Sequence, residues 1–105
     1  MLRILPGGLR LVPGGVVSSG GALPVSVAVH GDLAFVANAG DGGAGYTGFR
    51  LGGNGRLRPV AGSAISLPDG SQPGDVLFNG TGNSLAGVRA GTSLIDSFTV
   101  GAAGT

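Results

Sequence analysis

The sequence predicts an all-β protein built from four-stranded antiparallel meanders. Three observations lead to this prediction: segments recur at a spacing of 49 residues, the apolar segments are short, and Gly accounts for 24 of 105 residues. This much Gly, together with six Pro, would interrupt helices every few positions, but it suits the turns between short strands. Repeats of about 50 residues are the size of one supersecondary unit.

The repeat consists of residue pairs that match along two stretches, of which the Pro, Val and Phe pairs weigh most because Gly is so common. The identical pairs include Pro24/Pro73, Val27/Val76, Gly31/Gly80, Phe49/Phe98, Gly52/Gly101 and Gly55/Gly104. A partial third copy precedes them, since residues 2–4 resemble 49–51 and residues 9–12 resemble 57–60.

In the first full copy, residues 24–30 form the clearest predicted strand, because Val and small or polar residues alternate there. A tight turn at Gly31 leads into a continuously apolar strand over 33–37. After a Gly-rich loop over 38–45, a third strand is expected over 46–51.

Residues 52–55 supply the turn into a fourth strand over 56–60, which Pro59 restricts to a sheet edge. The second copy repeats the first three strands at 75–79, 84–88 and 94–100.

Four-stranded meanders at this period are typical of β-propeller blades, so we expect a partial β-propeller. Residues 1–23 would be the tail of a preceding blade and its connection, 24–72 a complete blade, and 73–105 an incomplete following blade. A small Gly-rich β-sandwich is the competing interpretation, and a solenoid is a third.

Composition restricts the function classes. The six basic residues are all Arg, the five acidic residues are all Asp, and the net charge is +1, which gives no electrostatic reason to expect nucleic-acid or membrane partners. Cys is absent, which excludes a thiolate nucleophile and a Cys-ligated metal, and no apolar run reaches transmembrane length. The compartment stays open, with a slight preference for the cytoplasm.

Residues 24–40, 46–51 and 55–57, and again 73–100, resemble blades of the lactonase-type seven-bladed β-propellers. This family includes bacterial 6-phosphogluconolactonases and 3-carboxymuconate lactonising enzymes. The resemblance implies a parent protein that hydrolyses or forms a lactone of a sugar acid or an aromatic-derived acid. Its substrate would be a small-molecule lactone or carboxylate, and no cofactor is expected.

The family's catalytic signature does not carry over to this chain. Active members have Pro-Arg-His on one inner strand and Glu on the neighbouring strand end, where this sequence has Pro73-Gly74-Asp75 and Ala90. Pro24-Val25-Ser26 likewise lacks a His that the family has at another site. We therefore expect no catalysis from this chain alone.

Arg89 and Asn38 are the candidate substrate-binding residues, because they occupy matching strand-end or loop positions. Arg89 could bind a carboxylate or phosphate, although a solvated loop Arg is the competing interpretation. For Asn38, a hydrogen bond to the loop backbone is expected ahead of a ligand contact. His30 is expected at an exposed turn, the loop 40–45 lacks the Lys and helix of a phosphate loop, and the Asp spacing predicts no metal site.

Two alternatives to a lactonase-like parent stay open, namely a non-catalytic β-propeller module that binds protein or glycan, and an autonomous Gly-rich β domain. We further expect exposed blade faces to support self-association. Asp96 lies between apolar neighbours in a predicted strand and needs a polar partner if that face is buried.

Overall fold

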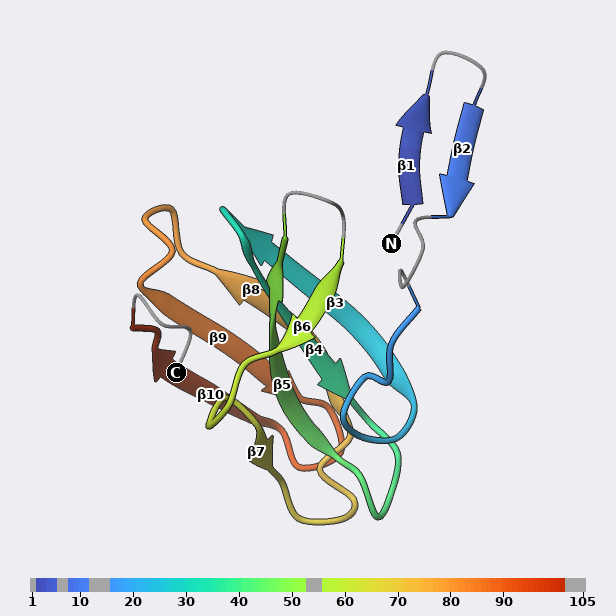
Figure 1. The fold of residues 1–105 in the computed structure, drawn as a ribbon. Helices are drawn as coiled ribbons and strands as arrows, with labels where there is room; N and C mark the ends of the chain where they lie inside the picture. The colour runs from blue at the N-terminus through green and yellow to red at the C-terminus, as the bar shows by residue number, and fades with distance from the viewer. Residues whose placement is uncertain (1, 6–7, 12–15, 53–55, 102–105) are drawn as a thin grey trace.

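A computed structural model describes residues 2–5, 8–11, 16–52 and 56–101. All regular secondary structure in these ranges is antiparallel β-structure, in two main sheets and a separate hairpin (Figure 1). The predicted all-β class is therefore confirmed.

The first main sheet contains β3 (Pro24–His30), β4 (Leu33–Asn38), β5 (Gly45–Leu51) and β6 (Leu57–Pro59), paired in chain order. A short strand, β7 (Ile65–Ser66), pairs with the start of β5. Gly31, at φ +60°, makes the tight turn between β3 and β4. The predicted turn residues 53–55 lie outside the described residues, but the Gly52 N–H donates to Arg56 O at 2.8 Å and closes that hairpin.

The second main sheet contains β8 (Pro73–Phe78), β9 (Ser84–Arg89) and β10 (Leu94–Thr99), in the order β10-β9-β8. Its strands begin and end within two residues of the predicted ones. The three strands correspond to β3, β4 and β5 of the first sheet, so the sequence repeat is also a structural repeat.

The correspondence extends to irregular backbone features. Leu23 and Gln72, which both precede Pro, have positive φ values of 56° and 47°. The strands that follow both shift register by one residue, between Pro24 and Ser26 and between Pro73 and Asp75. A left-handed conformation costs a non-Gly residue about 1–2 kcal/mol, so its recurrence shows that both copies need the same change of chain direction.

The separate hairpin of β1 (Leu2–Leu5) and β2 (Gly8–Leu11) has a pairing similar to that of β5 and β6. Arg3 lies opposite Arg10, as Arg50 lies opposite Arg58. The assignment of residues 1–23 to the end of a preceding unit stays a prediction.

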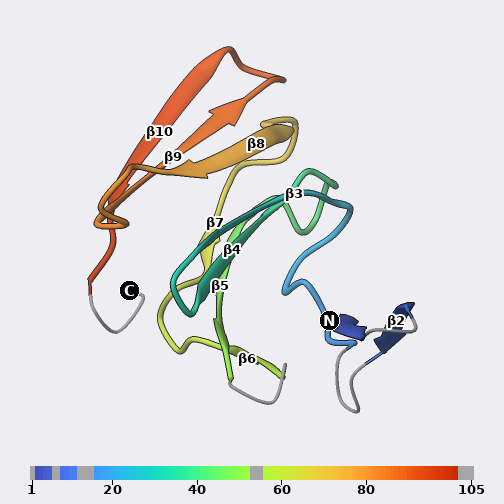
Figure 2. The same cartoon turned by 90° about the horizontal axis from the view of Figure 1, so that it is seen from above.

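The two main sheets pack face to face, with β8 beside β3 (Figure 2). The core between them includes Phe35, Ala37, Tyr46, Val76 and Leu85. Two edge-on ring contacts add to this core, Phe35 with Phe78 at 5.8 Å and Tyr46 with Phe98 at 5.5 Å between centroids.

The face of β3 turned towards the second sheet carries its small and polar residues. Ala28 is buried and the half-buried Ser26 donates from Oγ to Asp75 Oδ1 at 2.6 Å. His30 is exposed, as expected, and its ring packs against Phe78 at 5.7 Å between centroids. Val25, Val27 and Val29 face away from the second sheet and are exposed. An alternating strand usually buries its apolar side, so the outward valine face is an exception.

Candidate functional site

The candidate site lies at the end of each sheet where β4 and β9 finish, because Asn38 and Arg89 are the last residues of those strands. The chain leaves both strands in the same way. The Ala39 N–H donates to Leu23 O at 2.9 Å, and the Ala90 N–H donates to Gln72 O at 2.9 Å. Leu23 and Gln72, the two residues with positive φ before β3 and β8, thus accept hydrogen bonds from the residues that follow β4 and β9. Both strand ends are therefore held in the same way.

Asn38 is 1% exposed. Its Nδ2 donates to Ser19 O at 3.3 Å, which attaches the segment preceding β3 to the strand end. Its Oδ1 is buried and has no hydrogen-bond partner among the residues that the structure describes. An unsatisfied buried carbonyl costs free energy, so a donor that reached this oxygen would be bound favourably.

Asn38 is one of the residues that line a polar hollow of about 150 Å³. The remaining walls come from the Gly-rich loop before β5, the start of β5 and the end of β7, and include Gly43, Tyr46, Thr47 and Ser66. Gly21 and Gly43 pack so closely here that a side chain on Gly21 would overlap the Gly43 carbonyl. Gly is therefore required where the loops meet around Asn38.

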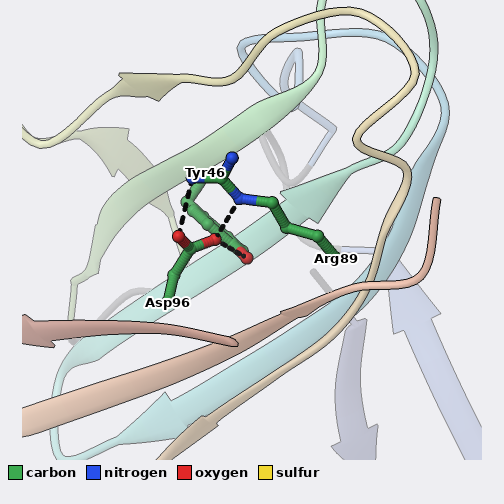
Figure 3. Close-up of polar contacts among 3 residues, drawn as sticks. All are labelled: Tyr46, Arg89 and Asp96. Atoms are coloured by element: carbon green, nitrogen blue, oxygen red, sulfur yellow. Dashed lines mark hydrogen bonds and ion pairs between the residues drawn. The ribbon is translucent and has the colours of Figure 1, made fainter. Parts of the chain in front are cut away.

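Arg89 does not present a free guanidinium group. Its Nε donates to Asp96 Oδ2 at 2.8 Å and its Nη2 donates to Asp96 Oδ1 at 2.7 Å (Figure 3). This forked geometry matches guanidinium to carboxylate, and it raises the pKa of Arg89. An anionic ligand would have to compete with Asp96 for the same N–H groups.

Asp96 has a second partner on the other sheet. The Tyr46 hydroxyl, from β5, donates to Asp96 Oδ2 at 3.0 Å (Figure 3). The Arg89 hydrogen bonds hold the pKa of Asp96 below its usual range, assisted by Tyr46. Burial, followed by the contact with Asp96, raises the pKa of Tyr46 well above that of free tyrosine.

Tyr46 joins the two predicted site residues, because it lines the hollow beside Asn38 and bonds the partner of Arg89. Gly87 makes this contact possible, since any side chain there would overlap the Tyr46 ring and hydroxyl. The sequence prediction missed Tyr46. The available signal was Asp96, whose need for a polar partner was anticipated and is met by Arg89 and Tyr46.

The other sequence candidates have structural roles. The His30 ring packs on Phe78, and a side chain on Gly82 would overlap it. In the Gly-rich loop, the Gly42 N–H donates to Asp69 Oδ1 at 2.8 Å, while the Gly70 N–H donates to Asp41 Oδ1 at 3.0 Å. These reciprocal bonds join the loop over 40–45 to the connection before β8.

Among the residues that the structure describes, no group of three His, Cys, Asp or Glu side chains is arranged to hold a metal ion. The same residues include no helix with the length and apolar character needed to span a membrane.

Comparisons with protein-family models, with curated proteins and with solved structures find no match to this chain.

Proposed function

We propose that this chain supplies two successive repeats of a lactonase-type β-propeller, with the Asn38 strand end facing a small-molecule lactone or carboxylate. The observation that carries the proposal is the unpartnered Oδ1 of Asn38, which is buried beside a polar hollow at the repeated strand end. Sugar acids and their lactones are rich in hydroxyl donors, which are the groups that a carbonyl acceptor binds.

Arg89 has a positioning role in this proposal. Because its forked contact with Asp96 uses both Nε and Nη2, the pair is neutral overall and holds β9 and β10 in register beside Tyr46. The ligand contact is therefore assigned to Asn38, and the acid and base groups of the reaction to other parts of the parent protein.

The proposal is tested by titrating the isotope-labelled chain with an aldonolactone and with the matching aldonate, and following backbone and Asn38 side-chain amide signals. We expect shifts at Asn38, Gly43 and Thr47. Asn38→Ala should weaken binding at least tenfold. Thr92→Ala, which alters an exposed residue in the turn between β9 and β10, should leave it unchanged. Equal affinity for both variants, with folding verified by circular dichroism, would contradict the assignment.

A non-catalytic binding module is the second candidate, and the neutralisation of Arg89 by Asp96 favours it. An oxyanion site needs donors directed at the developing charge, and the Nε and Nη2 groups of Arg89 donate to Asp96. Ring opening of the same lactone, followed by base uptake at constant pH with a buffer-only control, separates the two. Catalysed opening by the protein that carries this chain would exclude the binding module.

A further inference from the structure

Within the described part of the chain, the first sheet exposes apolar side chains on the outer side of β3, although Ala34 and Phe49 behind them are buried, and the second sheet exposes one apolar face. On the first sheet this outer β3 face includes Val25, Val27 and Val29 and borders an apolar groove of about 420 Å³. On the second sheet, the exposed face formed jointly by β8, β9 and β10, called here the outer β10 face, includes Leu77, Val88 and Ile95. These residues project from the sides of the sheets opposite to the interface already formed.

The repeat shows what each face is suited to contact. Val27 on the outer β3 face is 61% exposed, whereas its equivalent on the second sheet, Val76, is 3% exposed because it packs against the first sheet. Val29 corresponds in the same way to Phe78, which contacts Phe35 and His30. The outer β3 face is thus the counterpart of a surface that the second sheet buries.

The outer β10 face shows the converse relation. Leu77 is 69% exposed and Ile95 is 76% exposed, whereas their equivalents in the first sheet, Ala28 and Tyr46, are 7% and 1% exposed. Val88 likewise corresponds to Ala37, which is fully buried. This face is the counterpart of the surface that the first sheet buries.

We propose that a second copy of this chain docks head to tail, with the outer β10 face of one copy against the outer β3 face of the next. The contact reproduces between molecules the packing that β3 and β8 make within one molecule. Apolar side chains meet apolar side chains across it, which removes both patches from water. This inference concerns the chain of residues 1–105 by itself and does not depend on lactone binding. In a parent with further repeats, those repeats would occupy the same two faces.

Such an interface is heterologous, because the two copies use different surfaces. Repeating the same rotation leads to a closed ring or an open array, and does not stop at a symmetric dimer. Sedimentation velocity of the chain over a concentration series should therefore show species larger than a dimer. A monomer at every concentration, or growth that stops at a dimer, would overturn the proposal.

Two single variants distinguish head-to-tail docking from symmetric pairing. Val27→Asp places a charge on the outer β3 face, and Ile95→Asp places one on the outer β10 face. Each variant alone should be monomeric, because every head-to-tail contact between two copies of the same variant would include one face that carries the new charge. An equimolar mixture should form a 1:1 heterodimer that grows no further, since each variant retains the face that the other lacks.

Ala61→Asp, an exposed turn substitution outside both faces, adds the same charge and should associate like the unaltered chain. Both substituted positions on the faces are exposed, so far-ultraviolet circular dichroism should be unchanged. If either face variant unfolds, Val27→Thr and Ile95→Thr replace them, and the mixture is again compared with its components. A mixture that behaves as the sum of its components would refute head-to-tail docking.

Discussion

At the scale of single residues, Asp96 is the polar centre of the interface between the sheets. It accepts two hydrogen bonds from Arg89 in its own sheet and one from Tyr46 in the other. A carboxylate among apolar side chains is stabilised only when its charge is compensated, and here both a cation and a neutral donor compensate it.

Asp96 should make the stability of the protein sensitive to acid. Its folded pKa is below the unfolded value of about 3.9, so its contribution is present above that pH and is lost as the pH falls through the folded pKa. We expect Asp96→Asn to lower stability near neutral pH and to reduce the decline below about pH 4. Urea unfolding followed by circular dichroism between pH 2 and 7 measures both effects, and an unchanged pH profile would refute the role.

Tyr46 should make stability sensitive to base. Its folded pKa is raised, so its contribution is present below the unfolded pKa of about 10 and is lost as the pH rises through the folded pKa. It is the sole tyrosine and the chain has no Trp, so tyrosinate absorbance reports this residue alone. We expect ionisation above the pH at which free tyrosine ionises, accompanied by loss of circular dichroism. Ionisation near pH 10 in an intact fold would contradict the buried contact.

At the scale of elements, the crossing of β5 over β9 depends on one missing side chain. A Cβ on Gly87 would overlap the Tyr46 hydroxyl, which bonds Asp96. Gly74 provides a matched comparison in β8, because a Cβ there would meet only the Ala90 Cβ, at 3.7 Å.

Gly87→Ala should therefore lower the free energy of unfolding by about 1–3 kcal/mol, as expected for overpacking at a closely packed site. Gly74→Ala should be neutral or slightly stabilising, because Ala has less conformational freedom in the unfolded chain. Thermal and urea unfolding of both variants provide the comparison. Equal destabilisation would indicate a general intolerance of Ala in the second sheet and would remove the special role of Gly87.

The two units also differ where their elements are joined. The turn between β3 and β4 is a tight Gly31-Asp32 turn, whereas the corresponding connection over 79–83 is longer and is organised by Asn79, whose Nδ2 donates to Asn83 Oδ1 at 2.7 Å. β8 and β10 begin 49 residues after β3 and β5, whereas β9 begins 51 residues after β4, because the longer turn before β9 is offset by a shorter connection after it. Local turn chemistry therefore varies while the paired strands, which form the interface, are retained.

At the scale of the whole molecule, the two packed sheets expose different surfaces at the two ends of the stack. The first sheet exposes a valine face and the second exposes a face of Leu77, Val88 and Ile95. A pair of stacked repeats necessarily has two such terminal faces, since each repeat covers only one side of its neighbour. The head-to-tail docking proposed above is the consequence of this geometry, and the mixing experiment tests it at this scale.

Most strands could be predicted from the sequence, because their limits depend on Gly and Pro punctuation and on local alternation. The all-β class and the repeat followed from the same local signals. The short β7 was not predicted, since two residues carry no periodicity. The β-propeller arrangement and the boundaries at residues 23/24 and 72/73 remain predictions.

The candidate site was less accessible to prediction. The repeat alone was enough to place Asn38 and Arg89 at equivalent strand ends. It did not predict that Asn38 is buried or that Arg89 pairs with Asp96. Asn38 is in contact with Ser19 and Gly21 of the segment before β3. Arg89 is neutralised because Asp96 lies opposite Gly87 in the neighbouring strand. Both outcomes depend on side chains brought together by pairing and packing.

The sequence by itself determined the β class, most of the strand positions and the duplication, because these follow from local backbone preferences and from similarity along the chain. Only the tertiary structure decided which face of β3 is buried, how Tyr46 reaches Asp96 fifty residues away, and which faces stay open. The physical reason is that a side chain becomes buried only when a second surface packs against it. Equivalent side chains, such as Val27 and Val76, therefore have opposite exposure according to whether a neighbouring sheet covers them.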